Sequence, residues 1–534
     1  MKSNSKNLAG SISTIAMAAA ITCLMASMPA CAVDPDGEER LIVKNVNLIP
    51  MSSGEVIPDQ TVVIRDGMIE QIIAATDEKN FPNGKVVNGT GKFLMPGLVD
   101  VHSHIATEAE FRQKISDGEI TFADENFELG PLHTYDEKIL FQHLGAGVTT
   151  VLTLGSQQAM NDDALLILRD LTSSGEILGP RIIVSKRING HFMAVYGDGS
   201  YFKGESSVDR PLTAEHGRES VIAAKKAGYD AIKAYQFLNK ETYTAVVNTA
   251  RDNGMRIYGH LPQIDCASCV SPEYPLTEVK MDAIVHMEEL ARYAMGSMEN
   301  GIVPMAPADI SKWTSILVDS DIRIIPNHIA LANIIRMYVQ RSLPLDKELE
   351  RYIDSFTLYD WDASRLRHLS ADWRNQRGPN GESAEMFPAY YDFSRMLSRE
   401  IWKQGVPFAV GTDSQAIGGV TYGFSVHEEM LELKNLGLSN FEVLQSATVN
   451  GHSILGEDGS GTLQEGQRAD LLLLNSNPLE DIRNARDIAG VVANGRWLSM
   501  DDIKAKTEAD IIYWAEIDKQ LGLQIDRAAQ PETS

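Results

Sequence analysis

The sequence predicts an α/β protein in which a (β/α)8 barrel carries a small β-sandwich domain built from both chain ends. Short apolar segments alternate with helical segments between residues 96 and 455, which is typical of parallel βα units. Segments near both ends alternate apolar and polar residues, which is typical of half-buried antiparallel strands. Metal-binding residue types occur at the ends of several predicted barrel strands, where such barrels place their functional side chains.

The barrel strands are predicted from short apolar cores. These are PGLVDV (96–101), GVTTVLTL (147–154), PRIIVS (180–185), YDAIKAY (229–235), MRIYGH (255–260), MDAIVH (281–286), IRIIPN (322–327) and VPFAVGT (406–412). Helices are expected over 214–228 and 240–254, because apolar residues recur there at helical spacing and each run ends at a glycine. Ser439 and Glu442 form a capping box that predicts the start of another helix.

The domain boundaries follow from the changes of pattern. LIVKNVNLI and TVVIRDGMIEQIIA near the start, with RADLLLLNSNP and IAGVVANGRWL near the end, predict a composite β-sandwich over 36–95 and 456–505. The barrel occupies 96–455, and residues 506–534 form a C-terminal helix and tail. An insertion at 327–404 exceeds what a βα connection needs. It indicates either a lid or substrate wall, or an added helix pair for packing or oligomerisation.

The charge and the N-terminus limit the partners and the location. The 534 residues carry a formal net charge of −25, which argues against nucleic-acid binding because a polyanion is repelled. Residues 1–31 combine a positively charged start, an apolar stretch and small residues, as an export signal does. Cleavage at the A-x-A of Ala30 and Ala32 is one outcome, and lipidation of Cys31 is the other. We expect a periplasmic or outer-membrane lipoprotein of a Gram-negative-type bacterium, attached to the membrane only through a lipid on Cys31.

The residues that end the predicted strands carry the chemistry. They are His102 and His104 after the first strand, Lys233 on the fourth, His260 and His286 on the fifth and sixth, and Asp413 after the eighth. A lone histidine there is usually a satisfied surface or core residue, and a lone aspartate in GTDS is usually a turn residue or helix cap. Their coincidence at one level of a barrel indicates a metal site, since imidazole and carboxylate both bind divalent ions.

Longer motifs extend over nearly all of the chain after the export signal. They are PGLVDVHSH, LGAGVTTV, GYDAIKAY, YGHLP, DAIVH, VGTDS, SATVNGHSILG and GTLQEGQRADLLLL. With these motifs the chain resembles the amidohydrolase superfamily of metal-dependent hydrolases, and within it the branch of imidazolonepropionases and prolidase-like dipeptidases. The resemblance implies two divalent ions, with zinc expected, bridged by a carboxylated Lys233. It implies His102, His104 and Asp413 on one ion, and His260 and His286 on the other. An unmodified Lys233 that snorkels or pairs with an acid is the alternative.

The resemblance implies a hydrolase whose metal-activated hydroxide cleaves an amide-type C–N bond in a dipeptide, an N-acyl amino acid or a cyclic amide, and the N-terminal signal predicts that it is exported. Asp413 is the expected catalytic acid–base residue, because it would contact both metal and water. His191, Tyr235 and His328 lie near predicted strand ends and either bind the substrate or make structural hydrogen bonds. The alternatives are an esterase, lactonase or organophosphate hydrolase on the same site, and a non-catalytic barrel-fold binding protein. Barrels of this family commonly pair, so a homo-oligomer is also open.

Overall fold

The computed structural model describes residues 40–77, 84–156, 162–190, 209–235, 238–261, 271–295, 307–338, 340, 347–361 and 387–525. The predicted export signal with Cys31, and the candidate substrate residue His191, lie outside these ranges. Within them, no helix has both the length and the apolar character needed to span a bilayer.

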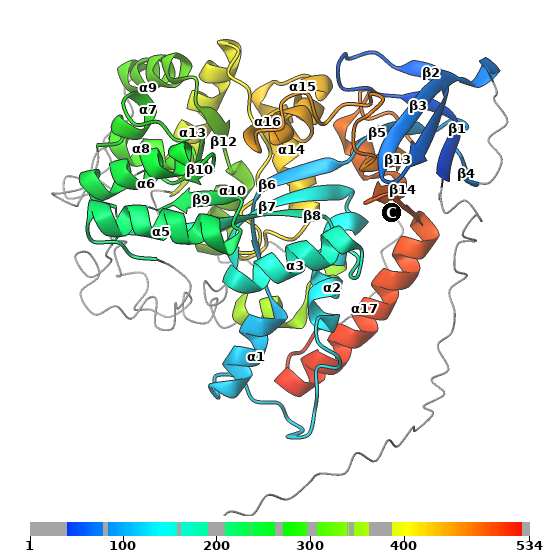
Figure 1. Ribbon diagram of the computed structural model, residues 1–534, viewed down its shortest axis with the longest axis horizontal. Helices are drawn as coiled ribbons and strands as arrows, with labels where there is room; N and C mark the ends of the chain where they lie inside the picture. Colours follow the sequence, from blue (N-terminus) through cyan, green and yellow to red (C-terminus); the bar gives the residue numbers. More distant parts are fainter. Residues whose placement is uncertain are drawn as a thin grey trace, which may run out of the picture.

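Strands from both ends of the chain pair in one mixed sheet of eight strands (Figure 1). They are β1 (Arg40–Leu48), β2 (Ile57–Arg65), β3 (Met68–Ala74), β4 (Gly84–Asn88), β5 (Phe93–Pro96), β13 (Leu471–Leu474), β14 (Ile488–Ala493) and β15 (Arg496–Ser499). The order is β15-β14-β13-β5-β1-β2-β3, and β4 also pairs with β1. Antiparallel pairing of β13 with β5 joins the two ends of the chain. Side chains from both ends, such as Val43, Ile64 and Leu473, share one buried apolar cluster.

A second sheet contains seven strands in sequential order, all parallel in the register of their pairs. They are β6 (Leu98–Ile105), β7 (Val148–Ser156), β8 (Arg181–Ile188), β9 (Ala231–Ala234), β10 (Arg256–Gly259), β11 (Ala283–Val285) and β12 (Arg323–Ile325). The first seven predicted strand cores are thus confirmed as parallel strands. Val99, Leu152, Ala231, Tyr258 and Val285 pack together, so several of these strands contribute to one apolar core.

The eighth predicted strand, at 406–412, is corrected: it is not a regular strand. This segment and the residues directly after it form two isolated parallel bridges. Phe408 pairs with Ile324 of β12 and Ser414 pairs with Ser103 of β6, so the two edges of the seven-stranded sheet are both contacted. Backbone hydrogen bonds are Ala409 N to Ile324 O (3.0 Å), Val101 N to Val410 O (3.0 Å), Thr412 N to His102 O (3.1 Å) and Asp413 N to His102 O (2.7 Å). Because two successive N–H groups share the carbonyl of His102, a regular ladder cannot continue there.

Helices occupy the connections between the parallel strands, and others follow the last of these strands, β12 (Figure 1). They are α1 (Glu108–Ser116), α2 (Thr134–Gly145), α3 (Asp162–Ser174), α5 (Ala214–Ala227), α6 (Lys240–Asp252), α7 (Tyr274–Thr277), α8 (Glu288–Met295), α9 (Pro307–Ser320), α10 (His328–Tyr338), α11 (Lys347–Glu350), α13 (Phe387–Lys403), α14 (Phe424–Leu436), α15 (Asn440–Ser446) and α16 (Val449–Ile454). The helices expected over 214–228 and 240–254 are confirmed, and α5 ends at Gly228 with φ 96°. The predicted capping box of Ser439 and Glu442 begins α15.

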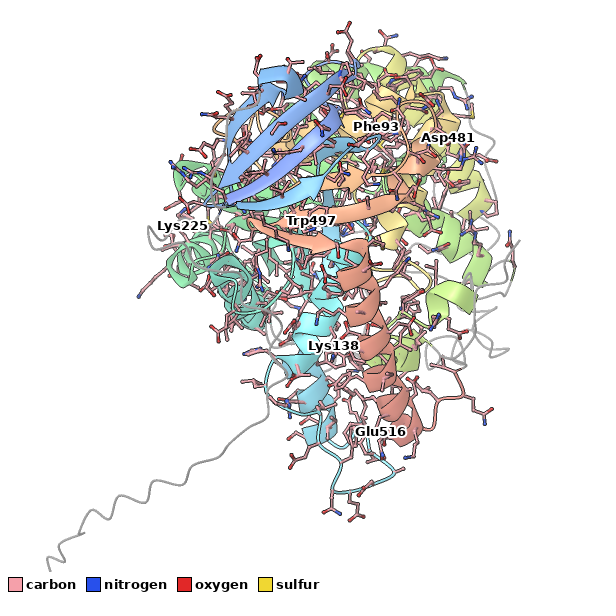
Figure 2. The ribbon with its side chains drawn as sticks, turned by 90° about the vertical axis from the view of Figure 1, so that its right-hand side faces the viewer. Phe93, Lys138, Lys225, Asp481, Trp497 and Glu516 are labelled. Carbon is pink, nitrogen blue, oxygen red and sulfur yellow. The ribbon has the colours of Figure 1, made fainter. Side chains whose placement is uncertain are left out.

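The last long helix, α17 (Met500–Leu521), crosses the expected boundary at 505 and runs from the eight-stranded sheet along α2 (Figures 1 and 2). Lys138 Nζ of α2 lies 2.6 Å from Asp510 Oδ1 of α17, and the ring of Trp514 packs edge-on against Tyr135. The predicted insertion at 327–404 contains α10, α11 and α13 in the part that the structure describes.

Candidate metal centre

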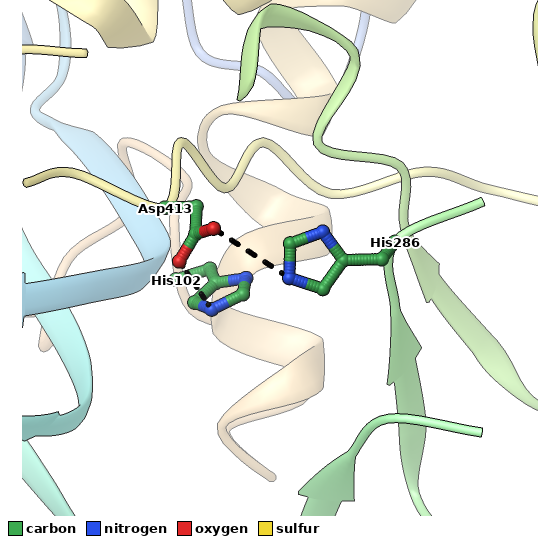
Figure 3. A group of neighbouring side chains, drawn as sticks. All are labelled: His102, His286 and Asp413. Carbon is green, nitrogen blue, oxygen red and sulfur yellow. Dashed lines mark ion pairs between the residues drawn. The ribbon is translucent and has the colours of Figure 1, made fainter. Parts of the chain in front are cut away.

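Three side chains from distant parts of the chain converge beside the carboxyl end of the parallel strands. His102 lies on β6, His286 directly follows β11, and Asp413 lies in the irregular segment beside β6. Figure 3 shows them facing one another, and one ligand atom of each lies within 4.8 Å of the others. Asp413 Oδ1 is 3.1 Å from His102 Nε2, and its Oδ2 is 3.6 Å from His286 Nε2. All three are buried.

His104 and His260 adjoin this cluster. His104 Nε2 is 3.2 Å from Asp413 Oδ1. The imidazole of His260 stacks on that of His286, with ring centroids 4.8 Å apart and planes 19° apart. The structure therefore brings together all four predicted histidine ligands and Asp413.

Lys233 is fully buried on β9, and its register neighbours are Arg187 on β8 and Tyr258 on β10. Among the described residues its Nζ has no hydrogen-bond partner, and it makes no ion pair with an acid. Burial lowers the pKa of Lys233 to about 7, although the charges of Asp413 and Glu289 act in the opposite direction. An unpaired buried ammonium is costly, so this position favours either a neutral amine or a modified one that gains partners.

The orientation of His102 follows from a chain of hydrogen bonds. Asn327 Nδ2 donates to the carbonyl of Gly411 at 2.8 Å, which fixes the amide with Oδ1 toward His102. His102 Nδ1 lies 3.0 Å from Asn327 Oδ1, so this ring nitrogen carries the proton and donates. The lone pair of Nε2 is therefore directed at Asp413 and the centre of the cluster. Asn327 Oδ1 also accepts from His286 N at 3.2 Å, which couples both histidines to one amide.

Two adjacent carboxylates hold the other ring nitrogens. Glu289 Oε1 lies 2.7 Å from His260 Nδ1, and its Oε2 accepts from Leu261 N at 2.7 Å. Glu288 Oε1 lies 3.1 Å from His286 Nδ1, within ion-pair distance but without the geometry of a hydrogen bond. Partners of this kind fix the tautomer and ring orientation of metal-binding histidines and raise their basicity.

The protonation states of three histidines and of Asp413 suit ligands of a cation, whereas Glu288 and Asp413, acting against burial, raise the pKa of His286. Burial lowers the pKa of His102, His104 and His260, and Lys233 acts on all three in the same direction. Burial opposes the ionisation of Asp413, but His102, His104 and His286 together outweigh it and hold the pKa of this carboxyl well below its usual range. Neutral imidazole and ionised carboxylate are the forms that bind divalent ions.

The backbone at the centre is strained. His286, Asp413 and Asn327 have φ values of 64°, 63° and 55°, in the left-handed region. This conformation costs a residue other than glycine roughly 1–2 kcal/mol, although Asn, Asp and His tolerate it better than most. Residues held in such conformations cluster at functional sites.

Asp100 and Gly411 seat the irregular segment against β6. Asp100 Oδ2 accepts from Thr412 Oγ1 at 2.7 Å, and its Oδ1 accepts from Thr412 N and His102 N, both at 3.1 Å. A Cβ on Gly411 would lie 2.4 Å from Ile325 Cγ2 and 2.8 Å from His102 Cβ, so only glycine permits this approach. The segment thereby presents Asp413 to the histidines.

The predicted substrate residues have different surroundings. The ring of Tyr235 lies 4.3 Å from that of His260, at the edge of the cluster. His328 is buried, and each of its ring nitrogens lies 3.1 Å from a serine hydroxyl of α13, Ser398 for Nε2 and Ser394 for Nδ1. His191 lies outside the described residues. Substrate contact by these residues stays a prediction.

The residues that orient the ligands were not among the site residues predicted from the sequence. They are Glu288 and Glu289, Asn327, and Asp100 with Thr412. A signal was present for the first pair, because two acids follow His286 in HMEEL, one turn from a strand end. Asn327 ends the seventh predicted strand, at the same level as the ligands.

The donor set fits divalent metal ions. Three buried nitrogens, His102 Nε2, His286 Nδ1 and Lys233 Nζ, have no hydrogen-bond partner among the described residues. Imidazole nitrogens converge with a carboxylate, which is the chemistry that zinc binds. A bound ion would give these atoms the partners that buried polar groups ordinarily have.

Comparisons with known proteins agree with this geometry. Residues 93–498 match the profile of the Amidohydrolase family. The chain is 35% identical over 80 residues to an imidazolonepropionase of Idiomarina loihiensis, covering 14% of this chain and 20% of that relative's length. It resembles the solved structure of a Xaa-Pro dipeptidase with bound methionine (TM-score 0.59, 18% identity, 86% of this chain and 100% of the other). It also resembles a bottromycin amidohydrolase (TM-score 0.62, 20% identity, 92% of each chain). The chain therefore belongs to the amidohydrolase family.

Proposed function

We propose that the protein is an exported metal-dependent hydrolase that cleaves an amide-type C–N bond in a dipeptide, an N-acyl amino acid or a cyclic amide. The observation that carries the proposal is the buried convergence of His102, His286 and Asp413, with one ligand atom of each within 4.8 Å of the others. The family and the names of the relatives, an imidazolonepropionase, a dipeptidase and an amidohydrolase, favour amides as the substrate class.

The residues divide into two ligand groups. His102, His104 and Asp413 would hold one divalent ion, and His260 and His286 the other, with zinc expected. Lys233, as a carbamate, would bridge them, and its buried amine without a hydrogen-bond partner supports this role. When bound, the ions supply Lewis-acid polarisation of the scissile carbonyl and lower the pKa of a water molecule.

Asp413 moves the proton. Its oxygens lie at the centre of the histidines, so the carboxylate is placed to accept the proton of the attacking water and return it to the leaving nitrogen. Asn327 and Glu289 keep the imidazoles fixed during this transfer. Tyr235, beside His260, is placed to contact the carbonyl or carboxylate of the substrate.

Two finer features belong to this proposal. We infer that the irregular segment 406–414, bonded to both sheet edges, closes a (β/α)8 barrel, and that the eight-stranded sheet folds into a β-sandwich. Export and lipid attachment at Cys31 rest on the N-terminal sequence. Labelled palmitate should be incorporated in a bacterial host and lost in Cys31→Ala; incorporation that survives the substitution would exclude this lipid site.

The activity is tested with the purified full chain against three panels: dipeptides, N-acyl amino acids, and ester or lactone analogues. We expect amide hydrolysis that is lost after chelation and restored by zinc. Metal-dependent turnover of esters or lactones with none of amides would overturn the assignment to C–N bonds. A protein that binds these compounds without turning over any of them, with zinc bound, would instead be a binding protein.

A further inference from the structure

A cavity of about 380 Å³ lies between α2, α14, α17 and the turn after α11. This volume falls in the range of roughly 300–1,000 Å³ that ligand pockets occupy. None of its lining residues belongs to the metal centre. Figure 2 shows α17 beside α2, and these two helices contribute most of the residues that line the cavity. The cavity is therefore separate from the proposed active site.

The walls of the cavity are aromatic and aliphatic. Phe141 of α2, Tyr352 after α11, Phe424 of α14 and Trp514 of α17 supply four aromatic side chains from four segments. Met500, Ile503 and Ile511 of α17 add aliphatic surface. Such walls favour a flat apolar group, because aromatic faces stack and the apolar area is removed from water.

The acidic side chains that line the cavity are neutralised by partners. Glu508 pairs with Arg351, whose Nη2 lies 3.3 Å from its carboxylate. Asp510 pairs with Lys138 at 2.6 Å. Neither acid therefore presents an uncompensated negative charge to the cavity.

The two cations that line the cavity have no such partner. The side chains of Arg486 and Lys504 make no ion pair and no hydrogen bond within the ranges that the structure describes. Glu428 acts electrostatically on Arg486 from beyond ion-pair distance. In a chain with a formal charge of −25, this leaves a locally cationic pocket, which attracts an anion.

We propose that this cavity is a binding site for an aromatic carboxylate. The ring lies among Phe141, Tyr352, Phe424 and Trp514, and the carboxylate pairs with Arg486 and Lys504. The site is independent of the proposed hydrolytic activity, because it shares no residue with the metal centre.

Isothermal titration calorimetry with 2-naphthoate tests the proposal, with uncharged 2-acetylnaphthalene as the matched probe. One molecule of 2-naphthoate should bind per chain, at least about tenfold more tightly than the ketone, since a hydrogen bond to a charged group contributes about 1.5–3 kcal/mol. Arg486→Gln should weaken 2-naphthoate by a similar factor. Arg483→Gln is the control. This exposed arginine lies with Arg486 on the short 3-10 helix Ile482–Arg486, pairs with Asp481 and does not line the cavity.

Gly145→Leu tests the location. A Cβ on Gly145, which lines the cavity, would have Ile503 Cγ2 at 3.8 Å as its nearest neighbour, so leucine fills the space without a backbone clash. Binding should be lost in this variant. Unchanged binding in Gly145→Leu would place the ligand elsewhere, the metal centre included, and overturn the proposal. Equal affinity for both probes would overturn it too. So would a wild-type dimer that dissociates in Gly145→Leu, because a second copy of the chain would then occupy the cavity. If Gly145→Leu does not fold, the comparison of Arg486→Gln with Arg483→Gln decides alone.

Discussion

His102 shows how single residues determine the chemistry of the centre. Its Nε2 faces Asp413 because Asn327 Oδ1 accepts a hydrogen bond from the protonated Nδ1, and Asn327 is itself oriented by the carbonyl of Gly411. Glu289 does the same for His260. The ligand atoms are thus directed by neighbours on other elements, and those neighbours should control metal affinity as strongly as they control geometry.

The first prediction at this scale concerns Asp413. Asp413→Asn removes the carboxylate that would accept and return the proton, and general acid–base catalysis contributes about 10²–10⁴-fold. We expect kcat to fall by at least about 100-fold while some metal remains bound through the histidines. Steady-state kinetics with metal analysis checks this, and normal turnover in Asp413→Asn would contradict the assigned role.

The second prediction concerns Glu289. Glu289→Gln weakens the partner of His260 Nδ1 without changing the size of the side chain. Metal affinity should fall by about 10–100-fold, measured by competition with a chromophoric chelator. Glu176→Gln, an exposed acid outside the centre, serves as the control and should leave the affinity unchanged. Equal affinity in both variants would show that Glu289 has no positioning role.

At the scale of elements, the site depends on how closely the irregular segment approaches β6. Gly411→Ala would place a Cβ 2.4 Å from Ile325 Cγ2 and 2.8 Å from His102 Cβ. Overpacking of this kind costs about 1–3 kcal/mol, and relief by movement of the segment would carry Asp413 away from the histidines. We expect a lower free energy of unfolding in urea and weaker metal binding together. Gly145→Ala, where a Cβ has room, is the control.

The helix that carries His328 gives a pH-dependent prediction. Glu429 of α14 caps α10 by accepting from His328 N (3.1 Å) and Ile329 N (2.7 Å). Burial raises the pKa of Glu429 to about 8, the two backbone hydrogen bonds lower it, and Glu432 and Asp100 raise it further. The folded state therefore holds this proton more tightly than the unfolded chain, so its contribution is complete below the ordinary carboxyl pKa and declines as pH rises toward 8.

Urea unfolding at pH 5, 6.5 and 8 measures this effect by comparing the wild type with Glu429→Gln. The free energy of unfolding of the wild type should fall relative to the variant as pH rises, by at most about 1.4 kcal/mol per pH unit. A difference between the two proteins that is constant across this range would contradict the raised pKa.

At the scale of the whole molecule, the sequence predicted the repeated parallel strands and the pairing of strands from the two chain ends. Seven parallel strands followed from apolar cores, and the pairing of β5 with β13 agrees with the alternation near both chain ends. Because His102, His286 and Asp413 all lie at the ends of predicted strands, the sequence predicted that they would lie close together. The irregular path at Thr412 and Asp413 could not be predicted, because it depends on contacts with β6 that only the folded chain creates. The roles of Asn327 and Glu289 depend on side-chain direction, which residue spacing does not give.

We propose that six side chains from five segments of the chain, with His102 and His104 both on β6, hold a pair of divalent ions at one rim. Anomalous diffraction at the zinc edge, from crystals of the purified protein grown with zinc, tests it most directly. We expect two anomalous peaks, one for each zinc ion, within about 2.0–2.3 Å of their ligand atoms. The ligands should be His102, His104, Lys233 as its carbamate, His260, His286 and Asp413. No peak at this position, or peaks held by other side chains, would contradict it.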